Sequence, residues 1–278
     1  MNEPLMRNIF KSIPAIPQEE KHNDYYKDGF LICGNCHTRK ETEINVLGEI
    51  RRVNCLCKCR AEERDRQYAE DKKRKWLDAA IREGIADREY LKWTMDMDDG
   101  KNPEISKAVR NYVENWQEMK AENIGLLFYG NVGTGKTFYA ANIANGLLDR
   151  GVGVIMTNIP SLMTRMSKGF EEDKAKILHK VSAASMLIID DIGIERDTPY
   201  AFEKIQEIID TRYRSGKPLI VTTNLSLDEM MSTEDVRYQR IFNRIVEMCC
   251  MPIKVVGRSR RVSKAMQKTE KARGILGL

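Results

Sequence analysis

The residues with the clearest chemistry form a glycine-rich segment near the middle of the chain. From Gly130 to Thr137 the sequence fits the phosphate-binding pattern G-x-x-x-x-G-K-[ST] in full. Glycines let backbone N–H groups turn towards phosphate oxygens, and the following helix N-terminus adds a positive partial charge. We expect Lys136 to reach the β- and γ-phosphates and the Thr137 hydroxyl to coordinate Mg²⁺. The predicted ATP-binding residues are Gly130, Asn131, Val132, Gly133, Thr134, Gly135, Lys136, Thr137 and Phe138.

A nucleoside triphosphatase also needs acidic groups on a second strand. The apolar residues Met186–Ile189 are followed directly by Asp190 and Asp191. Ligands of open parallel sheets bind at the carboxyl ends of the strands. We therefore expect Asp190 to hold Mg²⁺ through water, and Asp191 to act as the base or to orient the attacking water. Another apolar segment ends in Asn224, which is placed to hold that water or to sense the γ-phosphate.

Arginines gather near the last apolar segment of the chain. A planar guanidinium stabilises the charge that spreads over the phosphoryl oxygens in the transition state, and one such arginine contributes about 10³–10⁵ in rate. For each arginine the alternative is a solvated basic surface. The candidates are Arg240, Arg244, Arg258, Arg260 and Arg261.

A second group of reactive side chains is a cysteine cluster near the N-terminus. The odd total of seven cysteines and the absence of a secretory signal argue against a disulfide framework. The spacing C-x₂-C followed by C-x-C-x-C favours a tetrahedral zinc site, with reduced thiols in a loose loop as the alternative. A module this small and polar would draw its folding free energy from the metal. We favour Cys33, Cys36, Cys57 and Cys59 as ligands, with Cys55 as the substitute.

The elements that must position these residues follow from hydrophobic periodicity. Beyond residue 124, short apolar runs alternate with helical stretches, which indicates an α/β fold with a parallel sheet covered on both faces. A helix, Phe138–Leu148, follows the glycine-rich segment. The five predicted strands are Ile124–Tyr129, Val152–Met156, Met186–Ile189, Leu219–Thr222 and Ile253–Val256.

The N-terminal part has a different character. The pattern predicts a short hairpin turning at Gly48 between the cysteine pairs, a charged helix Arg60–Gly84, a loop Met95–Pro103 and an amphipathic helix Ile105–Lys120. We expect Cys249 and Cys250 in the core. The predicted domains are a zinc-binding domain with its charged helix at 1–84, a linker and helix at 85–120, and an ATPase domain at 121–278.

Composition excludes several classes of protein. No apolar run approaches the roughly 18 residues of a membrane-spanning helix, and no signal peptide is recognisable, so we expect a cytoplasmic protein without a membrane partner. The 46 basic and 41 acidic residues give a net charge of +5, which is too mild to indicate nucleic-acid binding by itself.

The ordered motifs GNVGTGKT, LIIDDIG and VTTN, followed by RIFNRI and GRSRR, resemble the DnaC/DnaI-type helicase loaders and their IstB relatives, which are AAA+ ATPases. The resemblance covers roughly residues 90–278. It implies an AAA+ P-loop domain without a C-terminal lid domain, because few residues follow Arg261. It also implies that Asn224 is the first sensor, Arg261 the second sensor, and Arg244 an arginine finger acting on a neighbouring subunit's ATP.

The resemblance also implies partners. In this family, loops that face the ring interior contact single-stranded DNA, and the matching positions here are Phe170, Thr198 and Tyr200. For Phe170, a core contact is the alternative. The N-terminal domain would bind the replicative helicase, and ATP would drive self-association. Asp191 departs from the glutamate of many AAA+ enzymes, which predicts weak hydrolysis.

The function implied is an ATP-dependent loader that delivers the replicative helicase to single-stranded DNA. Two alternatives stay open. One is an IstB-like transposition helper ATPase, which the cysteine module disfavours. The other is a zinc-dependent nucleic-acid-binding adaptor that uses ATP only as a switch, with phosphate contacts from Arg39, Lys40, Arg51 and Arg52.

Overall fold

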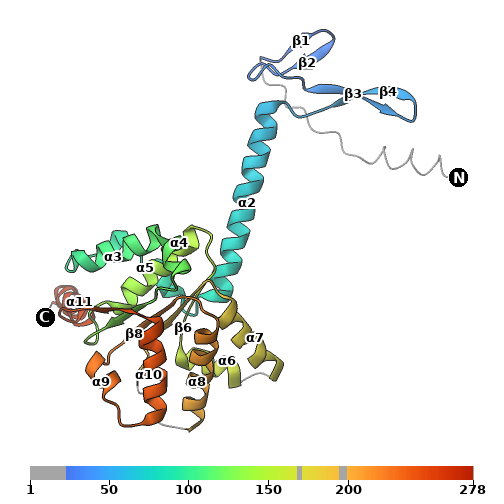
Figure 1. Ribbon diagram of the computed structural model, residues 1–278. Helices are drawn as coiled ribbons and strands as arrows, with labels where there is room; N and C mark the ends of the chain where they lie inside the picture. The colour runs from blue at the N-terminus through green and yellow to red at the C-terminus, as the bar shows by residue number, and fades with distance from the viewer. Residues whose placement is uncertain (1–22, 168–170, 194–198, 278) are drawn as a thin grey trace. The chain divides into compact units, whose positions relative to one another are not determined.

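The computed structural model describes residues 23–167, 171–193 and 199–277 (Figure 1). The chain divides into two compact units, with the boundary between Lys75 and Trp76. This boundary falls inside the long helix α2, Lys58–Gly84, whereas the predicted domain limit is the end of that helix.

The first unit contains two small antiparallel sheets. Strands β1 (Tyr25–Lys27) and β2 (Phe30–Ile32) form one, and β3 (Glu41–Val46) and β4 (Glu49–Asn54) form the predicted hairpin. Leu47 and Gly48 connect β3 to β4 with φ values of 55° and 88°. Two successive residues at positive φ characterise the tight turn whose twist matches that of the flanking strands.

The second unit is built on a five-stranded parallel sheet, as predicted. Its strands are β5 (Leu126–Tyr129), β6 (Val154–Asn158), β7 (Met186–Asp190), β8 (Leu219–Thr223) and β9 (Met251–Lys254). Their spatial order is β6-β7-β8-β5-β9, and every neighbouring pair is parallel. Strand β8 therefore lies between β5, which precedes the glycine-rich loop, and β7, which ends in the acidic pair.

Both faces of this sheet are buried because successive side chains of a strand point to opposite faces. On β5, Leu126 and Phe128 join one core cluster, and Leu127 joins the other. Helices α3 and α5 pack over the first face and α6, α8 and α10 over the second (Figure 1). The helices of this unit are α3 (Pro103–Glu114), α4 (Trp116–Ala121), α5 (Lys136–Asp149), α6 (Ile159–Ser167), α7 (Glu171–Ala183), α8 (Pro199–Arg214), α9 (Leu227–Met231), α10 (Val236–Met248) and α11 (Arg260–Leu276).

Three local predictions need correction. The predicted helix Ile105–Lys120 is two helices, because Asn115 leaves helical geometry at φ −99° and ψ 28° and separates α3 from α4. The predicted loop Met95–Pro103 contains a short 3₁₀ helix, η2 (Met95–Met97). Cys249 is buried as expected, but Cys250 is exposed because the chain leaves α10 there and turns towards β9.

The segment between α2 and α3 is tied to the sheet. Ile85 forms a parallel bridge with Met156 on the edge strand β6, and the backbone N–H of Ala86 donates to the Met156 carbonyl at 3.0 Å. A second 3₁₀ helix, η1 (Arg88–Lys92), follows. No helix among the described residues is long and apolar enough to cross a membrane.

Candidate functional site

The glycine-rich loop joins β5 to α5 at the carboxyl end of the sheet. Gly130, Gly133 and Gly135 have φ values of 132°, 81° and 107°, which residues with a side chain rarely adopt. A Cβ on Gly130 would lie 2.6 Å from the Val255 carbonyl oxygen. The Thr134 side chain is buried, and its hydroxyl donates to the Asn131 carbonyl at 3.0 Å. The loop is thereby folded into a fixed cradle that begins the helix at Lys136.

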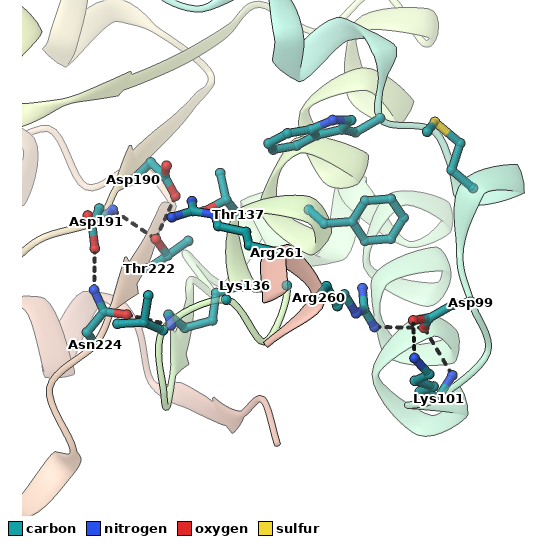
Figure 2. A pocket seen from close by; sticks show the side chains of 16 residues that line it. Asp99, Lys101, Lys136, Thr137, Asp190, Asp191, Thr222, Asn224, Arg260 and Arg261 are labelled. Atoms are coloured by element: carbon teal, nitrogen blue, oxygen red, sulfur yellow. Dashed lines mark hydrogen bonds and ion pairs between the residues drawn. The ribbon is translucent and has the colours of Figure 1, made fainter. Parts of the chain in front are cut away.

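Lys136 is buried beneath this loop and is held by three acceptors. Its Nζ donates to the Gly130 and Asn131 carbonyls at 2.8 Å each and to Asn224 Oδ1 at 2.7 Å. The Asn224 amide in turn donates to Asp191 Oδ1 at 2.7 Å (Figure 2). Burial lowers the pKa of Lys136, and the charges of the two aspartates oppose that shift. The predicted lysine, sensor and acid thus form one hydrogen-bonded chain across three segments.

Asp190 is buried at the end of β7. Its Oδ1 accepts a hydrogen bond from the Thr222 hydroxyl at 2.7 Å, and its Oδ2 accepts one from the Tyr90 hydroxyl at 3.1 Å. Burial raises the pKa of Asp190, and hydrogen bonds from Thr222, Thr137 and Tyr90 oppose that shift. Mg²⁺ prefers hard oxygen ligands and usually takes only one or two from the protein, the rest coming from phosphate groups and water. The Thr137 hydroxyl and the Asp190 carboxylate, which are hydrogen-bonded to each other, fit this requirement.

These groups surround one cavity of about 420 Å³. One end is polar, with Lys136, Asp190, Asp191 and Asn224, and the other carries apolar side chains (Figure 2). Six of the nine predicted ATP-binding residues line the cavity: Val132, Gly133, Gly135, Lys136, Thr137 and Phe138. The other three, Gly130, Asn131 and Thr134, form hydrogen bonds that hold the loop in its conformation. The lining residues Trp93, Met97, Asp99, Lys101 and Thr222 were not predicted, whereas Arg260 was among the candidate arginines. Of the unpredicted residues, only Thr222 belongs to a motif, VTTN.

Two arginines at the start of α11 reach the cavity. Arg261, the predicted second sensor, lines it, and its charge contributes to the lowered pKa of Lys136. The neighbouring Arg260 pairs with Asp99 at 2.8 Å and lies against the glycine loop, where a Cβ on Gly135 would be 2.7 Å from its guanidinium. Asp99 thus joins the segment before α3 to the start of α11.

Arg244, the predicted arginine finger, lies elsewhere. In the part of the chain that the structure describes, it does not line the cavity. It projects from α10, forms an ion pair with Asp210 of α8, and its guanidinium lies 5.6 Å from the Tyr213 ring centroid. Its side chain is 34% exposed, which leaves room for contact with another subunit.

In the first unit, the turn after β2 and the start of α2 bring four cysteines together. The sulfurs of Cys33, Cys36, Cys57 and Cys59 all lie within 4.8 Å of one another. Four sulfurs at 2.3 Å from a tetrahedral zinc ion would be about 3.8 Å apart, so this donor set fits zinc. Cys55 lies apart from them, and its thiol contacts the Arg39 carbonyl at 3.6 Å.

Hydrogen bonds hold the two cysteine pairs in place. Asp24 accepts a hydrogen bond from the Gly34 N–H at 3.0 Å and forms a buried ion pair with Lys40. The Thr38 hydroxyl accepts from the N–H of Lys58, the first residue of α2, at 2.9 Å. The first cysteine turn is therefore linked directly to the helix start that carries the second pair.

Of the three residues predicted to contact DNA, Tyr200 lies within the described part of the chain. Phe170 and Thr198 lie outside the described residues. Tyr200 lies in the first turn of α8 with 47% of its surface exposed, and the Lys204 ammonium is 5.5 Å from its ring centroid.

The burial of the Asp190 carboxylate leads to a prediction about how the stability of the protein depends on pH. Because burial raises its pKa above the ordinary 3.8, the folded protein holds the proton more tightly than the unfolded chain, and ionisation costs stability as the pH rises. Asp190→Asn should therefore stabilise the protein at neutral pH by about 0.5–2 kcal/mol, the usual size of a stabilising substitution. This gain should disappear as the pH falls towards 3.8 and the carboxyl becomes neutral.

Thermal unfolding measured across pH tests this expectation. Asp191→Asn, which changes the exposed neighbouring carboxylate, is the control. An Asp190→Asn variant that is less stable than the parent at neutral pH, or a difference that does not change with pH, would contradict it.

Comparison with known proteins independently supports an ATP-binding site in this chain. The family model described as IstB-like ATP binding protein matches residues 68–268. The replicative helicase loader DnaC of Escherichia coli strain K12 is 33% identical over 135 residues, which cover 48% of this chain and 54% of that protein. The replicative helicase loader DnaI of Bacillus subtilis strain 168 is 25% identical over 178 residues, 60% of this chain and 57% of that protein.

A solved structure gives the same picture of the fold. The crystal structure of a DnaC helicase loader superposes with a TM-score of 0.51 and 26% sequence identity, covering 61% of this chain and all of that one. The present chain spans only about half the length of the loaders that it matches in sequence.

Proposed function

The chain belongs to the IstB-like ATP-binding protein family, and on that premise we propose that it is an ATP-hydrolysing loader of a replicative DNA helicase. The observation that carries the ATPase part is the arrangement of Lys136, Asn224, Asp191 and Asp190 around one cavity. The names of the sequence relatives support the loader part.

The site suits phosphoryl transfer to water. When bound, Mg-ATP supplies the γ-phosphoryl group and neutralises part of the developing charge. Lys136 already lies beneath the phosphate loop, where it would exchange its carbonyl acceptors for phosphate oxygens. Asp191 and Asn224 are hydrogen-bonded to each other at the cavity edge, where together they would orient the attacking water. Trp93, Met97 and Phe138 are apolar lining residues that would exclude water around the nucleotide base.

Self-association would complete this site. Arg244 lies on a different part of the surface from its own cavity and is partly exposed, so it would act on the ATP of an adjoining subunit. Residues 1–84, with zinc held by Cys33, Cys36, Cys57 and Cys59, would bind the helicase. Phe170, Thr198 and Tyr200 would contact single-stranded DNA, with the two aromatic rings stacking on bases or sugars.

Lys136→Ala provides the simplest test of the ATP site. Losing a charge-assisted contact to phosphate should weaken ATP binding by at least about tenfold and abolish hydrolysis. Isothermal titration with ATP and a phosphate-release assay measure both quantities. Lys107→Ala, which removes an exposed lysine of α3 that does not line this cavity, is the matched control. Unchanged ATP affinity in Lys136→Ala would refute the proposed site.

The loader role is tested with the replicative helicase of the host. Co-elution of the purified protein with that helicase, in the presence or absence of ATP, is the expected result. If the two proteins do not co-elute in either state, the loader proposal fails. A protein that binds ATP but does not turn it over would instead act as an adaptor with an ATP switch.

A transposition helper ATPase is the second candidate, because the matching family model carries the IstB description. That model begins at residue 68 and leaves the four-cysteine module outside its range. The two functions differ in partner, so capture of a transposase in place of the helicase would favour the second candidate.

A further inference from the structure

The hydroxyl of Tyr90 contacts the site although Tyr90 belongs to none of the ATPase motifs. Tyr90 lies in η1, far from Asp190 along the chain, and only 7% of its surface is exposed. Its hydroxyl donates to Asp190 Oδ2 at 3.1 Å. Tyr90 does not line the cavity within the described part of the chain, and its direct polar contact with the site is this bond to Asp190.

Tyr90 completes the support of this carboxylate. Thr222 of β8 donates to Oδ1 at 2.7 Å, so the two oxygens of Asp190 are held by donors from different parts of the fold. Together with the hydrogen bond from Thr137, these two bonds restrict the rotation of the carboxylate about its Cβ–Cγ bond. Removing the Tyr90 hydroxyl would loosen that orientation and leave Oδ2 without this donor.

Tyr90 is itself held in place by α5, the helix that follows the phosphate loop. The side-chain amide of Asn145 donates to the carbonyls of Tyr90 and Trp93 at 2.9 Å each. The Tyr90 and Trp93 rings pack with centroids 5.5 Å apart. Asn145 thereby fixes η1 so that Trp93 lines the cavity and Tyr90 reaches the carboxylate behind it.

We propose that Tyr90 is a positioning residue that holds Asp190 in the orientation needed to bind Mg²⁺ with ATP. Outer groups that orient metal-binding carboxylates influence metal affinity strongly, and their loss typically costs 10–100-fold. This inference deepens the proposed ATPase function and rests on it. The Mg²⁺ site is then complete only when η1 is docked against α5.

Tyr90→Phe tests the hydroxyl alone. The test measures binding of a fluorescent ATP analogue, first without Mg²⁺ and then across a range of Mg²⁺ concentrations. We expect unchanged affinity without Mg²⁺, and about a tenfold higher Mg²⁺ concentration for half-maximal enhancement of binding and of ATP hydrolysis. A general loss of structure would lower both affinities together.

Tyr112→Phe is the matched control. Tyr112 is equally buried in the same unit, and its hydroxyl also donates one hydrogen bond, to the Ile124 carbonyl at 2.6 Å, but it does not contact Asp190. This variant should lose comparable stability in thermal unfolding and keep the parent Mg²⁺ dependence.

Asn145→Ala tests the docking of η1 while leaving the Tyr90 hydroxyl intact. It should shift the Mg²⁺ requirement in the same direction. The double variant with Tyr90→Phe should shift it less than the product of the two single effects, because both act through one contact.

The outcomes separate this inference from the proposed function. A parent protein that binds no ATP analogue with or without Mg²⁺ would refute the ATP site itself. A parent that binds the analogue, with Tyr90→Phe showing the parent Mg²⁺ dependence or Tyr112→Phe showing an equal shift, would overturn only the role of Tyr90.

Discussion

Arg244→Ala should reduce ATP turnover by about 10³–10⁵-fold while ATP binding stays close to that of the parent protein. The reason is geometric: the guanidinium lies away from the cavity of its own subunit, and under the proposed function it would act on the ATP of an adjoining subunit. Phosphate release and titration with ATP measure the two quantities separately. Loss of ATP binding in this variant would contradict the assignment.

The same arginine also has a structural contact, so a matched control is needed. Asp210→Ala removes the ion pair between α8 and α10 without removing the guanidinium. If Arg244 serves only that ion pair, the two variants should lose ATP turnover to the same extent. If it serves a neighbouring site, Asp210→Ala should keep turnover within severalfold of the parent.

Mixing two inactive variants tests whether the arginine acts between subunits. Lys136→Ala retains Arg244 but lacks a working phosphate loop, and Arg244→Ala retains the loop. Mixed assemblies should regain part of the activity, because some interfaces then combine an intact loop with an intact arginine. No recovery at any mixing ratio would refute action between subunits.

Cys57→Ser should cause the largest loss of structure in the chain. Cys57 is the most deeply buried of the four clustered cysteines, at 2% exposure. Structural zinc contributes about 10–16 kcal/mol to the folding of comparable peptides, which is more than this small unit can replace by packing. We expect zinc content to fall from one ion per chain to none and residues 23–57 to lose protection from hydrogen exchange.

Cys55→Ser is the matched control for this experiment. Cys55 is two positions away but lies outside the four-sulfur group. It should keep its zinc and its protection, and neither variant should change ATP affinity, because the cavity is built entirely from residues of the second unit. Equal zinc loss in both variants would contradict the chosen ligand set.

The phosphate loop, the acidic pair and the two cysteine pairs could be predicted from the sequence because each is made of consecutive residues. A glycine-rich turn between an apolar strand and a helix leaves its backbone few other conformations. The five strands were also predicted, since short apolar runs between helices indicate strands buried on both faces. The choice among the five cysteines could not be settled by spacing, because it depends on how the Thr38 hydroxyl links the first turn to the start of α2.

The strand order, in contrast, is decided only by the tertiary structure. Placing β8 between β5 and β7 puts Thr222 beside Asp190 and Asn224 between Lys136 and Asp191. The apolar runs carry no information on this order, because the burial of a strand does not say which strands are its neighbours: β7 and β8 are both buried at every position. No sequence pattern indicated that Tyr90, in a segment expected to be a linker, donates to Asp190. Such contacts join residues far apart in the chain, and only packing of the linker against α5 brings them together.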